Sequence, residues 1–465
     1  MREACGVVGI LAPGRDVAPL CYDALYALQH RGQESAGMAA DDGHHITVVK
    51  DNGLVSSVFS ESTLRALPGS AVIGHTRYST SGSANWTAAQ PVFRSAGVVG
   101  FALAHNGNLT NVPELAGRVG REVTAMLSDS DLVAELLARE VAAGATLAGA
   151  LAEVLPDVEG AYSMVLLEPG AVHAVRDPFG LRPLCLGRLG TADAPEGWVV
   201  ASETPALDLV GAAFVREVAP GELVTLTAEG VTSTRLLAPE PVERLCIFEF
   251  VYFARPDAYL MGRQVHSARR RMGERLAEQA PVDADLVAGV PDSGVPAAEG
   301  FAKRSGIPFG YALVKNRYIG RTFIAPDPEA RAAGVRRKLN PLRENIAGQR
   351  LVVVDDSIVR GTTTRALVTM LRDAGAAEVH LRISSPPFAW PCYYGIDTPT
   401  RAELLAATHS SAQMRDFTGA DSLEFISLAN LRAAIGLDGE CCDACLTGDY
   451  PAPVPVALGQ AGQRW

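Results

Sequence analysis

Two adjacent carboxylates, Asp355 and Asp356, follow directly after the apolar run 351–354. A buried parallel strand is typically a continuous apolar run, and open α/β sheets bind ligands at the carboxyl ends of their strands. The next residues, 357–363, contain a Ser, a Gly and two Thr and precede apolar residues at helical spacing. Such a loop offers hydroxyls and the N–H groups of a helix N-terminus, which suit a phosphate. These residue types predict a site for a phosphorylated sugar, with carboxylates for its hydroxyls or for Mg²⁺.

The segment LVVVDDSIVRGTT, residues 351–363, resembles the signature of phosphoribosyltransferases. Two acidic residues after a strand more often form a solvated turn or a helix cap, but the residues around this pair argue against that interpretation. The resemblance implies that Asp355 and Asp356 face the ribose hydroxyls of phosphoribosyl pyrophosphate and, with Ser293, support one Mg²⁺ per subunit. The residues that it implies for the sugar and its 5-phosphate are Ser357, Val359, Arg360, Gly361, Thr362 and Thr363. The departing pyrophosphate needs cations, and the candidates, which could equally form a solvated basic face, are Lys315, Arg317 and Lys338.

Cys5 lies four residues after the initiator, where a single cysteine is more often a small buried hydrophobe. The motifs that follow it change this interpretation: LQHRGQESAG (28–37), GHTRYSTSG (74–82), HNGNLTN (105–111), SDSD (128–131), RDPFGLRPL (176–184) and ASET (201–204). Together they resemble the glutamine amidotransferase family of the N-terminal-nucleophile type. We therefore expect a cysteine that attacks the side-chain amide of glutamine and releases ammonia.

The resemblance implies a role for each glutaminase residue. The Asn106 side chain and the Gly107 N–H would stabilise the oxyanion, Arg77 would bind the glutamine α-carboxylate, and Asp129 would bind its α-amino group. Asp131, two residues further on, is a weaker candidate for the last role. An α-amino group with a pKa of about 7.7–8.0 can act as the base near neutral pH, which requires Cys5 to be the first residue. We therefore expect the leader 1–4 to be removed, most simply by self-cleavage.

The second half of the chain resembles one family throughout, the glutamine phosphoribosylpyrophosphate amidotransferases. Its motifs are CIFEFVYFARPDA (246–258), GVPDSGVPAAEGFA (289–302), VKNRYIGRTFI (314–324) and RRKLNPLR (336–343). The resemblance implies that ammonia from the Cys5 site displaces pyrophosphate from the sugar, giving 5-phosphoribosylamine for purine synthesis. It also implies a lid around Gly320 that excludes water, inhibition by purine nucleotides, and a homotetramer. Gly294 departs from the family pattern, which commonly has a hydroxyl residue there.

Four cysteines belong to motifs of this family: Cys246, Cys392, Cys442 and Cys445. Their separations along the chain are too wide for a zinc finger, so a folded scaffold must assemble the site. Relatives with a cleaved leader carry one [4Fe–4S] cluster per subunit on the cysteines that these resemble, although four thiolates also suit Zn²⁺. Cys441 is expected to be a spare neighbour, and Cys21 and Cys185 are expected to be buried hydrophobes.

The elements that must position these residues divide the 465-residue chain into two domains. Residues 5–237 alternate short apolar strands with Gly and carry helical patterns at 18–30 and 129–153, which predict a layered α/β or α+β domain; the resemblance implies the αββα layering of an N-terminal-nucleophile glutaminase. Residues 238–450 alternate strands and helices, which predict a parallel sheet; the resemblance implies an α/β phosphoribosyltransferase domain of type I. The Pro-rich residues 451–465 are expected to form a flexible tail.

The composition excludes several classes of protein. A net charge of −11 argues against a nucleic-acid binder. The chain has no apolar stretch long enough for a membrane span and no signal peptide, so we expect a cytoplasmic protein with reduced thiols. Rival enzymes with the same glutaminase half, such as glucosamine-6-phosphate synthase or asparagine synthetase, should lack the 351–363 motif. A second rival is a regulator that senses phosphoribosyl pyrophosphate, but it would leave the glutaminase residues without a purpose.

Overall fold

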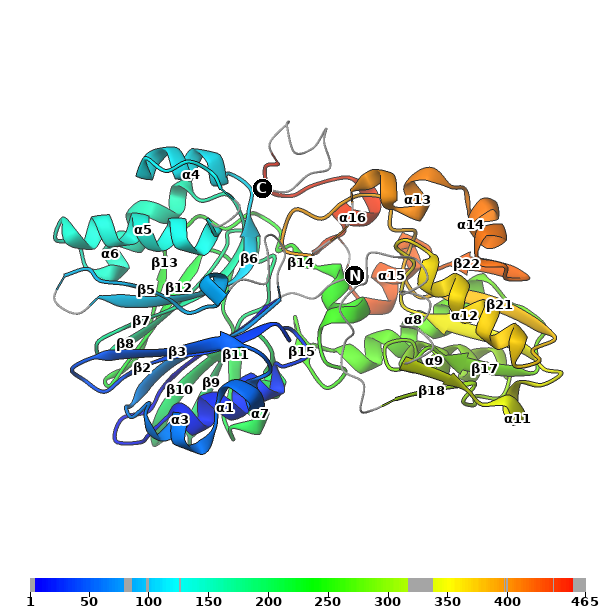
Figure 1. Cartoon of the computed structure of the whole chain (residues 1–465), viewed down its shortest axis with the longest axis horizontal. Coiled ribbons are helices and arrows are strands. Elements are labelled where there is room, and N and C mark those ends of the chain that lie inside the picture. Colours follow the sequence, from blue (N-terminus) through cyan, green and yellow to red (C-terminus); the bar gives the residue numbers. More distant parts are fainter. Residues whose placement is uncertain are drawn as a thin grey trace.

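The computed structural model describes residues 5–78, 86–97, 100–124, 127–316, 338–396, 398, 400–437 and 439–454. Figure 1 shows two lobes, the first with two antiparallel sheets and the second with a parallel sheet. The first sheet has the strand order β11 (Ala213–Glu217), β9 (Cys185–Gly190), β10 (Pro195–Ala201), β1 (Gly6–Leu11), β4 (Ala71–Arg77), β2 (Ser35–Asp41) and β3 (Ile46–Asn52). The second has the order β13 (Gly230–Arg235), β12 (Glu222–Thr227), β8 (Ala171–Arg176), β7 (Gly160–Glu168), β6 (Phe101–Leu109) and β5 (Val92–Arg94).

These two sheets are stacked and covered by helices on both outer faces. Val7 and Ile73 of the first sheet pack against Val165 and Val224 of the second, in a core that both inner faces share. The helices on the first sheet are α1 (Ala18–Ala27), α2 (Val55–Val58), α3 (Glu61–Arg65) and α7 (Thr204–Leu209). The helices on the second sheet are α4 (Val112–Val119), α5 (Asp129–Ala142) and α6 (Leu147–Val154). The predicted αββα layering is thereby confirmed.

The helical pattern at 129–153 forms two helices rather than one. Gly144 adopts a left-handed φ of +104°, which ends the first helix. The hydroxyl of Thr146 then accepts the N–H of Gly149 and caps α6. At the start of α5 the Ser128 hydroxyl accepts the N–H of Asp131, and Asp129 lies in the first turn, where a carboxylate is favoured. This cap fixes the position of Asp129.

The second lobe contains a parallel sheet with the order β17 (Leu286–Gly289), β20 (Arg350–Asp355), β21 (Glu378–Ile383) and β22 (Ser422–Phe425). Val352 and Val354 of β20 face one core, while Leu351 and Val353 face another, so both faces of this strand are buried. The first core is covered by α8 (Val265–Gln279), α9 (Val295–Ser305) and α15 (Leu428–Ile435), and the second by α11 (Arg343–Ile346), α12 (Thr362–Asp373) and α14 (Ser411–Thr418). The predicted parallel sheet is confirmed.

Shorter elements surround this sheet and reach toward the first lobe. They are β14 (Leu245–Cys246) with β23 (Cys441–Cys442), β15 (Tyr259–Leu260) with β16 (Arg263–Gln264), β18 (Leu313–Lys315) with β19 (Leu339–Pro341), α13 (Leu405–Thr408), α16 (Ala444–Thr447) and a π-helical turn at Glu249–Phe253. Three 3₁₀ turns cover Trp86–Ala88, Leu155–Asp157 and Arg401–Glu403. The segment 236–244 joins β13 to β14 and contains the expected domain boundary.

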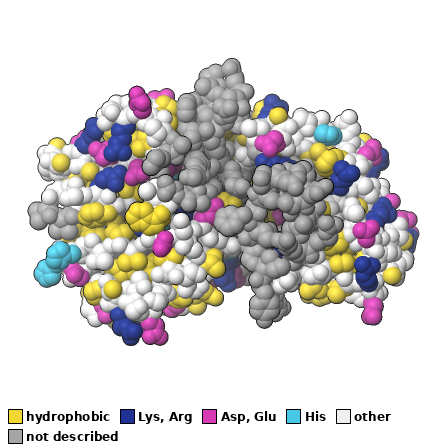
Figure 2. All heavy atoms as spheres, viewed as in Figure 1, with side chains coloured by type: hydrophobic (Ala, Val, Ile, Leu, Met, Phe, Trp, Pro, Cys, Tyr) yellow, Lys and Arg dark blue, Asp and Glu magenta, His cyan; other side chains and the backbone are white. Residues whose placement is uncertain are grey.

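The two lobes are joined by hydrogen bonds as well as by the chain. The Cys246 N–H donates to the Leu181 carbonyl at 3.2 Å, and the Tyr259 N–H donates to the Thr204 hydroxyl at 3.0 Å. The start of the expected flexible tail is packed, because Ala452 is buried and bonded to the Tyr394 hydroxyl; residues 455–465 lie outside the described part of the chain. Among the described residues no helix is long and apolar enough to cross a membrane. Figure 2 shows acidic and basic side chains interspersed over the described part of one face.

Candidate active site

Cys5 lies immediately before β1, and its thiol faces the residue that follows β4. The Sγ atom is 3.5 Å from both the N–H and the carbonyl oxygen of Tyr78. Burial raises the pKa of the Cys5 thiol above its ordinary value, although the Tyr78 backbone and the charge of Arg77 oppose this. The thiol therefore needs a base before it can act as a nucleophile. The expected leader, residues 1–4, lies outside the described part of the chain.

Asn106 and Gly107 lie next to each other on β6. The Asn106 side chain is 0% exposed, and in the described structure neither its nitrogen nor its oxygen has a hydrogen-bond partner. A buried amide without a partner costs free energy, which a bound ligand can repay. Gly107 has a φ of +154°, and a Cβ there would lie 1.9 Å from the Ala161 carbonyl oxygen. Only glycine fits at this position.

Arg77 and Asp129 both lie close enough to the Cys5 thiol to change its pKa. Arg77 is largely buried at the end of β4, with Glu34 at 3.9 Å. Burial tends to raise the pKa of Asp129, but the charge of His105 and the N–H groups of Ser130 and Leu109 hold it below its ordinary value. Asp129 therefore stays ionised, as a partner for an ammonium group requires.

Asp131 is engaged elsewhere. Its carboxylate accepts a hydrogen bond from Arg94 at 2.7 Å and another from the Ser128 hydroxyl at 3.0 Å. These contacts tie the Asp131 carboxylate to β5 and to the first turn of α5. Of the two carboxylates, Asp129 is the one that lies close enough to the Cys5 thiol to change its pKa.

Asp355 and Asp356 follow the last valine of β20, at the carboxyl edge of the parallel sheet. Burial, and for Asp355 the neighbouring Asp356, raises the pKa of both carboxyl groups above their ordinary value. Hydrogen bonds from Ser357 and Ser293 and the charge of Arg269 partly offset this for Asp356. Ser293 thus contacts Asp356, one of the two carboxylates. Two adjacent carboxyl groups at the edge of the sheet are a donor set that suits a hard divalent cation.

The loop 357–363 leads from this edge into α12. Gly361 adopts a left-handed φ of +72° immediately before the helix, and a Cβ there would lie 2.5 Å from the Leu405 side chain. Thr362 and Thr363 are exposed in the first turn of α12, which has no side-chain cap in the described structure. The Arg360 guanidinium instead contacts Glu403 at 3.1 Å. The loop presents the exposed side chains of Thr362 and Thr363 and a helix N-terminus, as a phosphate site requires.

Lys315 and Lys338 lie on neighbouring chain segments beside this edge. The Asn316 N–H donates to the Lys338 carbonyl at 2.8 Å, next to the β18–β19 pair. The Lys315 ammonium contacts Asp292 at 2.5 Å. Arg317 and the expected lid around Gly320 lie outside the described residues. At Gly294, a Cβ would lie 2.3 Å from the Val354 carbonyl oxygen, so this backbone would have to shift to accept a side chain.

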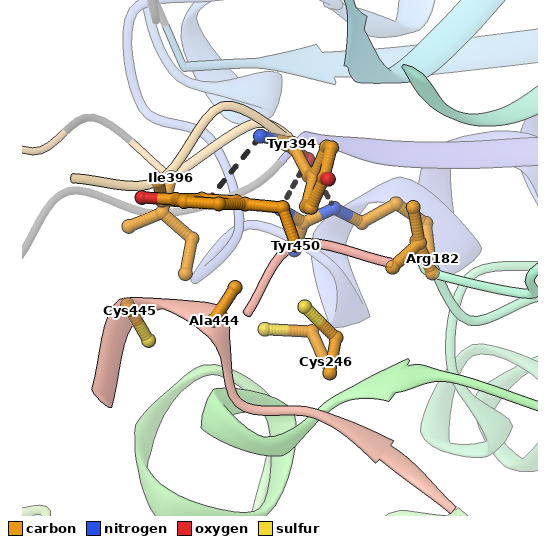
Figure 3. Close-up of a pocket in the computed structure, with 10 residues that line it drawn as sticks. Arg182, Cys246, Tyr394, Ile396, Ala444, Cys445 and Tyr450 are labelled. Carbon is orange, nitrogen blue, oxygen red and sulfur yellow. Dashed lines mark hydrogen bonds between the residues drawn. The ribbon is translucent and has the colours of Figure 1, made fainter. Parts of the chain in front are cut away.

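The four predicted cysteine ligands line one cavity between the lobes. β14 and β23 pair so that Cys246 stands beside Cys442, and Cys445 follows in α16. Figure 3 shows Cys246 and Cys445 at this cavity together with Arg182, Tyr394 and Tyr450. Its lining also includes Leu181, Cys392, Ile396, Cys442 and Ala444. Four thiols in an apolar setting suit a soft metal or an iron–sulfur group.

The other cysteines are placed as expected. Cys441 pairs with Leu245 and is absent from the lining of the cavity. Cys21 and Cys185 are buried in the core of the first sheet. Among the described residues, no three Cys, His, Asp or Glu side chains are grouped closely enough to hold one metal ion.

Sequence reasoning assigned no role to four charged residues that the structure buries together: Arg31, Arg182, Glu203 and Glu249. Each lies in a motif quoted above, but a motif does not reveal which distant motif it contacts. Arg31 and Glu249 are 218 positions apart and form two hydrogen bonds, of 2.8 and 2.9 Å. Three of these motifs also contain other charged residues, such as Glu34, Asp177 and Asp257, so the sequence offered no signal that singles out the four.

Comparisons with known proteins identify both domains. Residues 75–209 match the glutamine amidotransferase domain, and residues 257–384 match the phosphoribosyl transferase domain. An amidophosphoribosyltransferase of Mycobacterium tuberculosis is 53% identical, over 99% of this chain and 89% of the relative. A solved structure described as the allosteric regulatory enzyme of purine biosynthesis is 44% identical, with a TM-score of 0.89 and 97% of each chain covered. The glutamine phosphoribosylpyrophosphate amidotransferase of Bacillus subtilis, solved with ADP and GMP, is 43% identical, with a TM-score of 0.89 over 97% of this chain and 98% of that one.

Proposed function

Because this chain belongs to the amidophosphoribosyltransferase family, we propose that the Cys5 site and the Asp355–Asp356 site perform the two halves of one reaction. The chain is a glutamine-dependent phosphoribosyltransferase of purine biosynthesis. Glutamine, water and phosphoribosyl pyrophosphate give glutamate, 5-phosphoribosylamine and pyrophosphate. The alternative of a regulator without activity is not favoured, because relatives that align over nearly the whole chain are enzymes.

In the first half-reaction Cys5 attacks the amide carbon of glutamine. The α-amino group of Cys5, freed by removal of residues 1–4, takes the thiol proton and passes it to the departing ammonia. Asn106 and the Gly107 N–H stabilise the oxyanion, and water then hydrolyses the thioester to glutamate. Arg77 and Asp129 hold the two ends of the amino acid. The observation that supports this assignment best is the buried Asn106 amide, which has no partner among the described residues and lies in the same lobe as the Cys5, Arg77 and Asp129 set.

In the second half-reaction the ammonia nitrogen forms a bond to C1 of the sugar as the bond to pyrophosphate breaks. Asp355 and Asp356 orient the ribose hydroxyls, and Mg²⁺, held by these carboxylates and Ser293, would neutralise charge on the pyrophosphate. The side chains and N–H groups of Ser357 and Val359–Thr363 hold the 5-phosphate. Lys315, Arg317 and Lys338 receive the departing pyrophosphate, which leaves as a polyanion.

The four cysteines around the cavity are proposed to hold one [4Fe–4S] cluster. Their thiols line a common apolar cavity, and four thiolates are the ligand set of an iron–sulfur cluster. The cluster would have a structural role, because the reaction transfers no electrons. Protein purified without oxygen should show broad visible absorbance and about four iron atoms per chain. Zinc with a colourless protein would instead identify a Zn²⁺ site.

The remaining proposals concern partners and location. ADP and GMP were bound to the Bacillus subtilis relative, and we expect purine nucleotides to inhibit this chain as well. A homotetramer and a cytoplasmic location are likewise proposed. Sedimentation of the purified protein would test the assembly, and titration with each nucleotide would test the inhibition.

The decisive experiment compares the wild type with Cys5→Ala. Pyrophosphate release is measured with phosphoribosyl pyrophosphate and Mg²⁺, first with glutamine and then with a high concentration of ammonia. The variant should lose glutamine-dependent release and keep ammonia-dependent release, because only the nucleophile is missing. Undiminished glutamine use by the variant would refute the assignment of Cys5. Sequencing of the N-terminus of active enzyme tests the leader, and an intact Met1 would contradict its removal.

A further inference from the structure

Four buried charged side chains form a continuous cluster between the two lobes: Arg31, Glu203, Glu249 and Arg182, each at most 1% exposed. Arg31 donates from Nη1 and Nη2 to the two oxygens of Glu249 at 2.9 and 2.8 Å, and it also contacts Glu203. The Arg182 Nη1 atom lies 3.5 Å from Glu249. Two positive and two negative charges thus balance within a region from which water is excluded. We call these four residues the buried charge cluster.

One end of the buried charge cluster holds the nucleophile. The Arg31 Nε–H donates to the carbonyl oxygen of Cys5 at 3.0 Å. This bond fixes the backbone from which the Cys5 thiol projects. Arg31 touches no atom that reacts, so its role is to position Cys5.

The other end of the buried charge cluster lies at the cysteine cavity. Arg182 lines that cavity and donates from Nε to the Tyr394 carbonyl at 2.9 Å, a contact visible in Figure 3. Glu249 begins the π-helical turn three residues after Cys246. A movement of Cys246 or of the Tyr394 backbone must therefore move a member of the cluster.

A second set of contacts joins the cavity to the oxyanion residues. The segment 392–395 begins with Cys392 and packs against β6. The Asn108 amide donates to the Tyr393 carbonyl at 2.8 Å. At Gly395 even a Cβ would lie 3.2 Å from the Gly107 carbonyl group, so the two backbones are in close contact. The segment that begins with Cys392 is therefore in direct backbone contact with Gly107, the residue after Asn106.

Breaking any one of the ion pairs in the buried charge cluster is energetically costly. A buried charge that loses its partner costs several kcal/mol, so the members of the cluster can shift only together. The cysteine cavity would hold these members in place, because its thiols belong to three separate chain segments, at Cys246, at Cys392 and at Cys442–Cys445. Whatever the thiols hold fixes all three segments at once.

We propose that the buried charge cluster and the segment 392–395 transmit the state of the cysteine cavity to the glutaminase site, so that Arg31, Arg182 and Glu249 are positioning residues for Cys5. Emptying the cavity then slows attack on glutamine and leaves transfer from free ammonia unchanged. This inference rests on the proposed role of Cys5 and adds a form of control to it. The cysteine cavity then controls the glutaminase site as well as holding the two lobes together.

The first test is Glu249→Gln, which keeps the size of the side chain and removes its charge. The matched control is Glu222→Gln, because Glu222 is also buried and accepts two hydrogen bonds from one arginine, Arg216, at 2.6 and 2.8 Å. Two rates are measured in the whole protein: glutamine hydrolysis, and covalent labelling of Cys5 by a glutamine analogue that carries a diazoketone. Glu249→Gln should lower kcat for glutamine and the labelling rate by about 10- to 100-fold, with little change in KM. The control should change neither.

The second test needs no substitution and covers the case in which Glu249→Gln fails to fold. Wild-type protein is compared before and after a chelator and an oxidant have removed the metal group, with metal content measured in each sample. Labelling of Cys5 should fall by about 10-fold or more, while pyrophosphate release from free ammonia stays within about twofold.

Three results separate the possible outcomes. If labelling of Cys5 is unchanged after the cavity is emptied, or falls only in step with ammonia-dependent release, the inference is overturned. If Glu249→Gln folds and labels at the wild-type rate, the charge cluster has no positioning role. If Cys5→Ala still uses glutamine, the failure belongs to the proposed function, and the present inference falls with it.

Discussion

Asn106 is a buried side chain with two polar atoms and, within the described structure, no partner for either. Such an arrangement persists only if a ligand completes it or the fold compensates for it. Asn106→Ala should lower kcat for glutamine by about 10²–10³-fold, because one oxyanion donor is lost. Ammonia-dependent pyrophosphate release, measured in the same preparation, is the control and should be unchanged. A fall of less than about threefold in glutamine use would exclude Asn106 from the oxyanion site.

The buried side chain of His75 leads to a prediction of how the free energy of unfolding depends on pH. Burial, together with the charges of Arg77, His105 and Lys50, lowers its pKa from 6.5 to about 3, although a hydrogen bond with the His105 carbonyl opposes this. The unfolded chain therefore binds a proton near pH 6.5 that the folded chain does not accept until about pH 3. The contribution of His75 to the free energy of unfolding is fully present above pH 6.5. It falls by about 1.4 kcal/mol per pH unit as the pH drops toward 3.

The measurement is urea unfolding between pH 7.5 and 4.5, comparing wild type with His75→Gln, which keeps a hydrogen-bond donor. The difference in free energy of unfolding between the two should shrink as the pH falls, because the variant lacks the titrating group. Parallel curves for the two proteins would show that His75 binds its proton equally in both states.

At the scale of elements, β20 and α12 were the most predictable part of the fold. Both faces of β20 are buried, so its apolar run is continuous, and α12 shows its apolar stripe at Leu367, Val368 and Leu371. The division of 129–153 into two helices was missed because Gly144 alone signals the break. The π-helical turn at Glu249–Phe253 could not be predicted, since Glu249 is held by Arg31 from the other lobe. A local sequence pattern predicts a helix or strand well when its packing partners are close in sequence or uniformly apolar.

Gly361 joins the phosphate loop to α12 and allows a direct test of that junction. Gly361→Ala places a Cβ at a φ of +72° and 2.5 Å from Leu405, so it should cost about 1–3 kcal/mol of stability. The distorted loop should also raise KM for phosphoribosyl pyrophosphate by about tenfold or more, because a misplaced binding group weakens its contacts.

Gly375 provides the matched control at the other end of the same helix. It also has a positive φ, of +99°, but a Cβ there would meet only Ala347 at an ordinary distance of 3.4 Å. Gly375→Ala should lower stability and leave KM for phosphoribosyl pyrophosphate unchanged. Equal effects of the two variants on KM would mean that the 357–363 loop does not hold the substrate.

At the scale of the whole molecule, the candidate sites differ in how far the sequence could predict them. The residues of the glutaminase and transferase sites lie in motifs, and the structure places each described set on one lobe. The buried charge cluster takes Arg31, Arg182 and Glu203 from one lobe and Glu249 from the other. No motif contains such a contact, because it depends on how two folded lobes meet. The sequence therefore predicts the chemistry of each site better than the connection between them.

That connection predicts that the first lobe does not function alone. In a chain ending at residue 237, Arg31 loses both hydrogen bonds to Glu249, and Arg182 loses the Tyr394 carbonyl. Unpaired buried arginines cost several kcal/mol, and the loss of the 392–395 segment uncovers Gly107. The isolated lobe should therefore unfold at lower urea concentration than the full chain and hydrolyse glutamine at least about tenfold more slowly. Adding residues 238–465 as a separate chain should restore part of both properties. Full activity of the isolated lobe would show that Cys5 needs nothing from the second half.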